Sequence, residues 1–396
     1  MTTSKSRNDV SQLRVLQFIT PAGFYGAERW VLAMANNSDH ERVRCDLAVT
    51  EEGPQQDLSV ARYFPAEAGE VHYLKMNGRF DWRVVRQLEQ VIRERDIQVI
   101  HTHGYKSDIL GLLAAKRTGI ACVSTPHGFS GKVGLKLATF IRLGTHMLRY
   151  FDAVVPLSEE LVSDMKRFGV PEHKTHFIRN GVDLKEIDQT LSELEKLPQQ
   201  ESEKTTKTIG FIGQMIPRKG LGDLLDAFDR FYQEHPEYRL QLVGDGSQRK
   251  ELEEKAASLP STSAIEFLGF RSDRLALLSR FNLFVMTSSL EGIPRCMMEA
   301  MAVGIPVVAY DIPGVDQLID HEKTGLLAPP GDSCELARCC ERVLEDSALA
   351  ESLASSGRSR INEQYSAARM AREYEELFRQ LMARGGAPVA SERGAG

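Results

Sequence analysis

The stretch SLEGIPRCMMEAMAVGIPVV, residues 289–308, decides the fold of the second half of the chain and much of its chemistry. Glu291 follows a strand-like run, and Glu299 lies eight residues later within a helix-like run. The helix is apolar on nearly every face, because around Glu299 it consists largely of Met297, Met298, Ala300, Met301 and Ala302. We therefore expect a buried helix that carries a carboxylate into the protein interior.

A buried carboxylate needs strong hydrogen-bond partners, because an unpaired charge is unfavourable in apolar surroundings. Hydroxyl groups of a bound ligand are suitable partners for Glu291 and Glu299. The backbone N–H groups of Gly292 and Ile293, at the start of the helix, would add donors for a sugar or a phosphate. The alternative is that the two glutamates cap the helix or form internal ion pairs.

Outward from this stretch, short β-branched runs alternate with longer amphipathic stretches, a pattern typical of βα units around parallel sheets. The predicted strands are 13–19, 44–49, 97–101, 121–125 and 153–157 in the first half, and 208–212, 239–243, 265–268, 283–287 and 306–310 in the second. In the first half the predicted helices are 26–37, 81–95, 106–117 and 158–168. The fold class is therefore α/β, with two Rossmann-like domains.

A polar, acidic stretch separates the two series of βα units. The chain accordingly divides into an N-terminal domain at 1–184, a linker region at 185–207 and a C-terminal domain at 208–365. A helix pattern at 366–385 follows the second sheet, and we expect this helix to return to the N-terminal domain. Residues 386–396 are predicted to form a disordered tail.

Composition limits the classes of function. The 396 residues are 42% hydrophobic and 26% charged, with a net charge of −6, which argues against a disordered chain. Residues 1–185 carry 25 Lys/Arg against 21 Asp/Glu, so neither half has the strongly basic character of a nucleic-acid-binding domain. The six cysteines lie at no zinc-like spacing and indicate reduced thiols in a cytoplasmic protein. The first apolar run, Val15–Ile19, is too short for a signal peptide or a membrane span.

Two adjacent cations follow the first strand of the second domain. Arg218 and Lys219, in GQMIPRKG, have the charge needed to neutralise a diphosphate, although such a pair in a loop is also commonly just solvated. Gly244 and Gly246 open a helix, but Arg249 stands where a dinucleotide fingerprint has its third glycine, which argues against an NAD enzyme. No cofactor and no metal site are predicted, and the chain contains no D-x-D tripeptide.

In the first domain, histidines follow two of the predicted strands. His101 and His103 form an H-x-H pair, but no third metal ligand lies at a recognisable spacing. His127, in a Pro-His-Gly turn, is the stronger candidate for a functional residue, and a core histidine with its hydrogen bonds satisfied is the alternative. Gly23 and Gly26, in PAGFYGAERW, lie in the first strand-to-helix turn, where glycines would let backbone amides approach a phosphate or an acceptor oxygen.

Together these motifs resemble those of the retaining glycosyltransferases of family GT4. The spacing of Glu291 and Glu299 is similar to the E-x7-E motif of that family, and FIGQMIPRKG, LVGDGSQRKELEE, FLGF and IRNGVD accompany it over about residues 12–385. The resemblance implies a GT-B fold, in which two Rossmann-like domains with parallel sheets face a central cleft. The N-terminal domain would then lie on the acceptor side, and the C-terminal domain would bind the nucleotide sugar.

The resemblance also implies roles for individual residues. Glu291 would bind donor-sugar hydroxyls and Glu299 the ribose, while Lys219 would clamp the leaving diphosphate. Gln214 stands where the family has a second clamping cation, a charge that Arg218 would supply from four residues away. The remaining positions that match family motifs are His127, expected to face the donor sugar, and substrate-binding Gly23, Gly26, Phe270, Gly292 and Ile293.

The reaction implied is transfer of a sugar from a nucleoside diphosphate sugar, of UDP or GDP type, to an acceptor hydroxyl with retention of the anomeric configuration. The expected acceptor is a lipid-linked saccharide of a cell-surface polysaccharide. Two alternatives stay open: a nucleotide-sugar 2-epimerase, disfavoured by the E-x7-E spacing, and an inactive nucleotide-sugar-binding subunit, to which only Gln214 points.

A basic segment suggests where the protein acts. Between Ile109 and Phe151 there is no Asp or Glu, while Lys132, Lys136, Arg142 and Arg149 alternate with apolar residues at roughly helical spacing. Such a helix would lay its apolar side into lipid and its cations against anionic head groups. The alternative is an ordinary helix packed on the first sheet. We expect a cytoplasmic enzyme that binds the inner membrane face peripherally.

Overall fold

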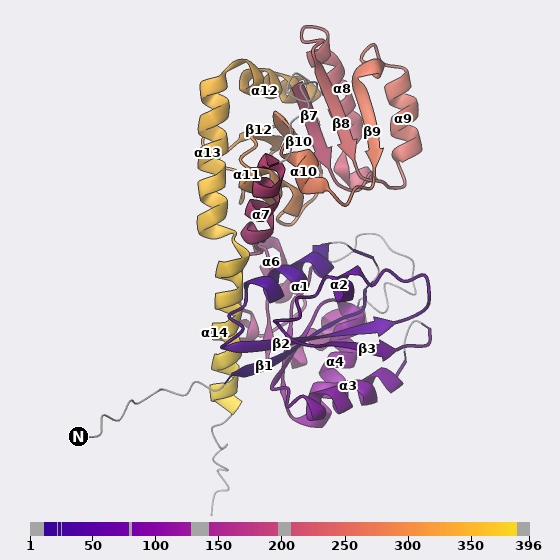
Figure 1. Ribbon diagram of the computed structural model, residues 1–396, viewed down its shortest axis with the longest axis vertical. Coiled ribbons are helices and arrows are strands. Elements are labelled where there is room, and N and C mark those ends of the chain that lie inside the picture. Colours follow the sequence, from indigo (N-terminus) through magenta and orange to yellow (C-terminus); the bar gives the residue numbers. More distant parts are fainter. Residues whose placement is uncertain are drawn as a thin grey trace, which may run out of the picture. The chain divides into compact units, whose positions relative to one another are not determined.

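The computed structural model describes residues 12–21, 23–24, 26–78, 81–127, 142–196 and 207–385 (Figure 1). The chain forms two compact units. The first unit consists of Met1–Arg179 together with Ala367–Gly396, and the second unit consists of Asn180–Ser366.

The first unit is built on a six-stranded parallel sheet in the order β3-β2-β1-β4-β5-β6. Its strands are β1 (Leu13–Ile19), β2 (Val43–Glu51), β3 (Val71–Lys75), β4 (Val99–Thr102), β5 (Ala121–Ser124) and β6 (Ala153–Val154). Its helices are α1 (Gly26–Asn37), α2 (Ser59–Arg62), α3 (Arg83–Glu94), α4 (Tyr105–Thr118), α6 (Glu159–Arg167) and α14 (Ala367–Gly385).

Helices cover both faces of this sheet. Helices α1 and α14 lie on one face, and α3 and α4 lie on the other (Figure 1). The apolar run of β1 explains the two layers, because successive side chains point to opposite faces of a strand. Val15 packs into the cluster that contains Trp30 of α1, whereas Leu16 packs into the cluster that contains Leu88 of α3.

The second unit repeats this arrangement with a six-stranded parallel sheet in the order β12-β11-β10-β7-β8-β9. Its strands are β7 (Lys207–Ile212), β8 (Tyr238–Val243), β9 (Ile265–Gly269), β10 (Leu283–Met286), β11 (Val307–Tyr310) and β12 (Leu326–Ala328). Its helices are α7 (Leu184–Glu195), α8 (Leu221–Tyr232), α9 (Arg249–Ala257), α10 (Arg274–Leu278), α11 (Arg295–Val303), α12 (Ser333–Glu345) and α13 (Ser347–Gln364). Helix α8 packs against α9 and α12, and α11 packs against α7, α10 and α13.

Both sheets reverse their strand order at one point. The first strand of each unit has the fourth strand beside it, so β1 pairs with β4 and β7 pairs with β10. In open α/β sheets, ligands bind beyond the carboxyl ends of the strands at such a reversal. The loops after these four strands are therefore where side chains from distant parts of the sequence come together.

The ten strands predicted from the sequence are present, but each sheet also has an edge strand that the sequence analysis missed. These are β3, of which only Leu74 is buried, and the three-residue β12. An edge strand is bordered by a neighbour on one side only and is often short, so it leaves a weak apolar signal in the sequence.

The stretch expected to be a linker, 185–207, differs from that expectation in its first half. Helix α7 lies there and belongs to the second unit, where it packs against α10 and α11. Asp183 caps the helix by accepting hydrogen bonds from the backbone N–H groups of Lys185 and Glu186, and Ile187 is buried. The helix was not predicted because its apolar stripe is narrow and most of the stretch is polar.

Helix α14 closes the first unit. It contacts α1 and β5, and its buried face includes Met370, Tyr374 and Phe378. The C-terminal helix of the chain is thus part of the unit formed by the N-terminal residues. The predicted tail, 386–396, lies outside the described residues.

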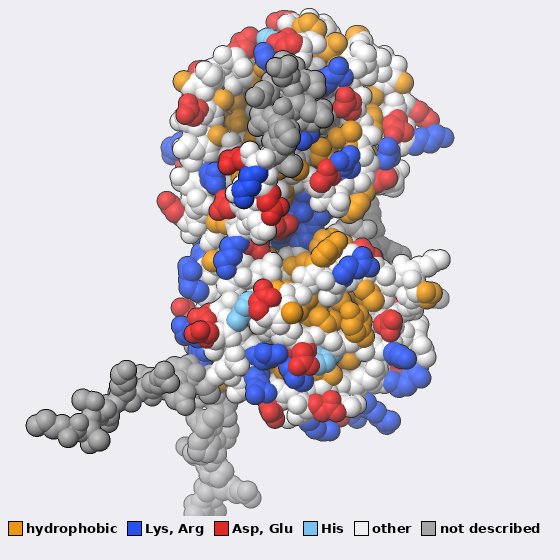
Figure 2. Space-filling model, in the orientation of Figure 1, with side chains coloured by type: hydrophobic (Ala, Val, Ile, Leu, Met, Phe, Trp, Pro, Cys, Tyr) orange, Lys and Arg blue, Asp and Glu red, His pale blue; other side chains and the backbone are white. Residues whose placement is uncertain are grey.

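Most of the basic segment proposed to touch a membrane, residues 128–141, also lies outside the described residues. Over the face of the molecule shown in Figure 2, Lys and Arg side chains are interspersed with Asp and Glu in both units. Within the described ranges, no helix has both the length and the apolar character that crossing a bilayer requires.

Candidate functional site

A charged cluster forms where the loops after β7 and β10 meet. Lys219 Nζ donates a hydrogen bond to Glu291 Oε1 at 2.5 Å, and Arg218 Nη1 lies 3.2 Å from Glu291 Oε2. Lys219 and Glu291 are both buried, at 7% and 8% exposure, whereas Arg218 is exposed to solvent. Residues 72 positions apart become ion-pair partners because β7 and β10 are neighbouring strands.

Backbone contacts fix the two loops to each other. The Thr287 hydroxyl donates to the carbonyl oxygen of Lys219 at 2.9 Å, and the backbone N–H of Ser289 donates to the carbonyl oxygen of Arg218 at 2.8 Å. Gly220 has a left-handed φ of +60°, and a Cβ at this position would overlap the Thr287 carbonyl oxygen. The glycine of the RKG sequence therefore allows the cation loop to lie against the loop that carries Glu291.

Glu299, on α11, lies in a second ion-pair network. Arg274 of α10 donates to both of its carboxylate oxygens, at 3.2 and 3.1 Å, and Arg295 Nε donates to Oε1 at 3.0 Å. Arg274 Nη2 also reaches Glu186 of α7 at 3.1 Å. Burial alone would lower the pKa of Arg274, but the ion pairs with Glu299 and Glu186 raise it above the ordinary arginine value.

The two glutamates thus have protein partners, which is the ion-pair alternative stated for them from the sequence. The arrangement of Glu291 also suits an anionic ligand with hydroxyl groups, because it lies with Arg218 and Lys219 at the carboxyl ends of the adjacent strands β7 and β10. The sequence analysis missed Arg274. A charged residue in the short run RLALL, next to a buried sheet, is the signal that could have drawn attention to it.

The other candidates of the second unit lie in loops that follow strands. Gln214 is exposed after β7, Gly292 is exposed after β10, and Ile293 is half-buried beside it. Phe270 directly follows β9 and exposes 66% of its surface, which is unusual for a large apolar side chain. In the sheet order, β9 is separated from β7 by β8, so Phe270 lies farther along the same edge than Gln214.

The first unit has a chain of neutral hydrogen-bonding groups at its own strand reversal. His103 Nε2 lies 2.7 Å from Gln17 Oε1, and His103 Nδ1 lies 3.1 Å from His127 Nε2. Because an amide oxygen only accepts, His103 Nε2 carries its proton and Nδ1 accepts from His127 Nε2–H. This assignment makes Nδ1 the acceptor nitrogen of the His127 ring.

His101 belongs to a parallel set of contacts. Its Nε2 lies 2.7 Å from the Thr125 hydroxyl, which lies 2.8 Å from the hydroxyl of Tyr374 on α14. The Trp30 ring packs edge-on against His101, His127 and Tyr374. These contacts bring His101 of β4 and His127, which follows β5, into one aromatic cluster.

The histidines of this cluster are neutral at physiological pH. Burial lowers the pKa of His127 to about 3, and burial with the neighbouring imidazoles lowers those of His101 and His103 well below the ordinary value. The sequence analysis missed Gln17 and Tyr374. A glutamine in the middle of the apolar strand LRVLQFI is a signal for a buried polar contact, whereas Tyr374 lies too far along the chain to be paired from sequence.

The glycines of the first loop occupy the end of β1 and the start of α1. Gly23 is buried in the loop, and Gly26 is the exposed first residue of α1. A Cβ at Gly26 would meet open space, so packing does not explain a glycine at this position.

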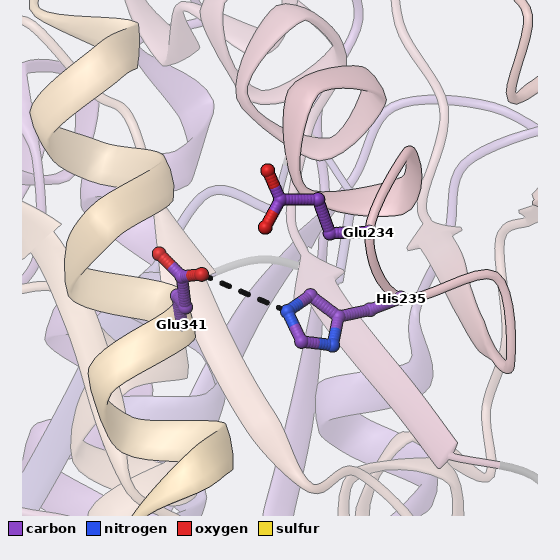
Figure 3. A group of neighbouring side chains, drawn as sticks. All are labelled: Glu234, His235 and Glu341. Carbon is purple, nitrogen blue, oxygen red and sulfur yellow. Dashed lines mark ion pairs between the residues drawn. The ribbon is translucent and has the colours of Figure 1, made fainter.

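One group of described residues has the spacing of metal ligands. Glu234, His235 and Glu341 place one ligand atom each within 4.8 Å of one another (Figure 3). His235 Nε2 lies 3.8 Å from Glu341 and 3.6 Å from Glu345, and its ring stacks on Phe231. Glu234 and His235 directly precede the amino end of β8, and Glu341 lies on α12, whereas Lys219 and Glu291 follow the carboxyl ends of β7 and β10. The group is therefore separate from the charged cluster.

Comparisons with known proteins agree with this architecture. The model of the family described as glycosyltransferase family 4 matches residues 24–186, and that of the glycosyl transferases group 1 matches residues 193–360. The chain is 34% identical over 188 residues to exopolysaccharide phosphotransferase SCO2592 of Streptomyces coelicolor, which is 46% of this chain but only 20% of that protein.

A second relative matches over nearly its full length. The chain is 24% identical over 366 residues to the UDP-Gal:alpha-D-GlcNAc-diphosphoundecaprenol alpha-1,3-galactosyltransferase of Escherichia coli, which covers 88% of this chain and 91% of that enzyme. Among solved structures, Alr3699/HepE of Anabaena in complex with UDP superposes with a TM-score of 0.77 at 22% identity, over 93% of this chain and all of HepE.

The matching families account for both units, and each unit has the six-stranded parallel sheet expected for this fold. The chain therefore belongs to the group 1 glycosyltransferases with the GT-B fold, enzymes that transfer a sugar from a nucleotide sugar.

Proposed function

We propose that this glycosyltransferase uses a UDP or GDP sugar and transfers the sugar, with retention of configuration, to a hydroxyl of a lipid-linked saccharide. The observation that carries the proposal is the cluster of Arg218, Lys219 and Glu291 at the strand reversal of the second unit. The HepE structure with UDP supports the uridine nucleotide. The donor and the diphosphoundecaprenol acceptor named for the Escherichia coli relative support the substrate class.

In this proposal, the cations of the second unit bind the diphosphate. Arg218 and Lys219 would neutralise its charge and stabilise the additional negative charge that develops as the sugar leaves. Glu299 would accept hydrogen bonds from the ribose diol and Glu291 from hydroxyls of the sugar. Phe270, Gln214, Gly292 and Ile293 are proposed to contact the donor from the loops around them.

In the first unit, His127 is proposed to contact the donor sugar through Nδ1, the acceptor nitrogen that its bond to His103 leaves available. A neutral imidazole suits this role, because it accepts a hydrogen bond from a sugar hydroxyl without adding positive charge. Gly23 and Gly26 are proposed to let backbone amides approach the acceptor. We propose that the clamp works without a metal ion, since the two cations supply the charge that a metal would otherwise provide.

The function is tested by incubating the enzyme with UDP- and GDP-sugars, with and without a lipid-linked saccharide acceptor, and measuring the released nucleotide. Release should require the acceptor and should continue in EDTA, and proton NMR of the product should show the donor's anomeric configuration. Nucleotide release without acceptor would indicate an epimerase instead. Loss of activity in EDTA that Mg²⁺ restores would overturn the metal-free clamp, and an inverted product would overturn retention.

We further propose that the enzyme works in the cytoplasm at the inner membrane face, through the basic segment that contains Lys132, Lys136, Arg142 and Arg149. Each cation near an anionic surface contributes about 1 kcal/mol, so four would support loose and reversible binding. Sedimentation with vesicles should show binding that rises with anionic lipid and falls with salt and with substitution of the four residues by Gln. Equal binding to neutral vesicles would contradict the proposal.

A further inference from the structure

Glu291 contacts both cations of the candidate diphosphate site. Both carboxylate oxygens are engaged, Oε1 by Lys219 and Oε2 by Arg218. Arg218 Nη1 also donates to the carbonyl oxygen of Leu290 at 3.0 Å. Lys219 Nζ and Arg218 Nη1 are therefore both held by the loop that carries Glu291.

The Glu291 carboxylate stabilises a buried positive charge. Lys219 is only 7% exposed, and an ammonium group that is removed from water is stable only with an anion or several acceptors close to it. Glu291 is the anion within hydrogen-bond distance of Lys219 Nζ among the described residues. It thereby compensates the buried charge of Lys219.

A diphosphate needs the same donors. Phosphate oxygens bind ammonium and guanidinium groups through short, charge-assisted hydrogen bonds, and Lys219 Nζ and Arg218 Nη1 are the groups that now contact Glu291. We infer that Glu291 is the resident counter-ion of Arg218 and Lys219, and that a nucleoside diphosphate binds by displacing its carboxylate from them. This inference rests on the proposed function, because it takes the two cations as the diphosphate site.

The exchange favours a nucleotide sugar over the bare nucleotide. A displaced Glu291 carboxylate gains new hydrogen bonds only when the ligand carries sugar hydroxyls. When the sugar has been transferred, Glu291 loses those hydroxyls and competes again for Lys219, which promotes release of the nucleoside diphosphate. Glu291 is thus a specificity residue that discriminates donor from product.

Calorimetric titration with UDP tests the inference, because it predicts that Glu291→Gln binds UDP more tightly than the wild type and not more weakly. Glu291→Gln should bind UDP about tenfold more tightly than the wild type, because one charge-assisted hydrogen bond no longer has to be broken. Glu299→Gln is the matched control, since it removes the same charge from the same unit eight residues away. That variant should bind UDP more weakly. Unchanged or weaker binding of UDP by Glu291→Gln would overturn the inference.

The ion pair between Lys219 and Glu291 can be tested without any nucleotide. In urea unfolding, Glu291→Gln should destabilise the protein more in the wild-type background than in a Lys219→Met background, with a coupling of about tenfold in the unfolding equilibrium constant. Additive effects would contradict the counter-ion role. If Glu291→Gln does not fold, Glu291→Asp draws the carboxylate back by one methylene and should bind UDP more tightly than the wild type, and weaker binding would again contradict it.

These experiments separate the inference from the proposed function. A wild-type protein that binds neither UDP nor GDP while its unfolding cycle shows coupling would refute the donor proposal and, with it, the displacement step. A wild-type protein that binds UDP normally but shows no gain in Glu291→Gln would refute the displacement alone.

Discussion

The two units share one strand order, but the side chains at the strand reversal are charged in the second unit and neutral in the first. At the reversal of the second unit, Lys219 and Arg218 are ion-paired with Glu291, and Arg274 and Arg295 with Glu299. At the reversal of the first unit, His103 bridges Gln17 and His127 in a neutral chain. The same backbone architecture therefore supplies a charged surface suited to a diphosphate in one unit and a neutral one suited to hydroxyl groups in the other.

The largest effect on turnover should come from removing a cation from the charged cluster of the second unit. Lys219→Met removes the buried ammonium group that we propose stabilises the developing charge of the leaving diphosphate. Turnover should fall by about 10² to 10³, the loss typical when one stabilising donor is removed. Steady-state kinetics with the best donor measures the loss, and circular dichroism establishes that the variant folds. A folded variant with full turnover would show that Lys219 does not serve the reaction.

Removing an imidazole from the histidine cluster of the first unit should lower turnover by less and should leave nucleotide affinity nearly unchanged. His127→Ala should lower turnover with little change in the affinity for the bare nucleotide, because the diphosphate is assigned to the second unit. Parallel kinetics and UDP titrations separate the two readouts. A large loss of UDP affinity would contradict the division of roles between the units.

The neutral histidines of the first unit should make the stability of the protein depend on pH. His101, His103 and His127 stay neutral in the folded protein, while the unfolded chain protonates its histidines near the ordinary pKa of 6.5. The unfolded state therefore binds more protons, and stability falls as the pH drops below 6.5, by up to about 1.4 kcal/mol per pH unit for each histidine. Asp108 acts in the opposite sense, because burial raises its pKa to about 7 and the folded state then binds its proton first.

His103→Gln isolates one member of this set. Urea unfolding between pH 6.5 and 5 should show a shallower loss of stability for the variant than for the wild type, by about one proton. The same slope in both proteins would mean that His103 is protonated in the folded state, and the tautomer assigned to His127 would fail with it.

Much of the fold could be predicted because the central strands are continuous apolar runs. Val15 and Leu16 bury opposite faces of one strand, which leaves a signal that survives in the sequence. The edge strand β3 has one buried residue, Leu74, and α7 has one, Ile187, within a polar stretch. A single apolar position gives no periodic pattern, so neither element was predicted from the sequence.

The site divides in the same way. Glu291, Glu299 and Lys219 could be proposed from local motifs, and their approach follows once β7 and β10 are neighbours. The contacts of Arg274 with Glu299 and of Tyr374 with Thr125 could not be predicted, because they form through tertiary packing that no local spacing encodes. The ion pair between Lys219 and Glu291 likewise became visible only with the geometry of both loops.

Phosphorus NMR of bound UDP tests most directly whether the charged cluster of the second unit holds the donor diphosphate. Wild type and His127→Ala should both shift the UDP phosphate resonances, and Lys219→Met should leave them close to those of free UDP at the same concentration. Undiminished shifts in Lys219→Met, or their loss in His127→Ala, would contradict a diphosphate site at Lys219.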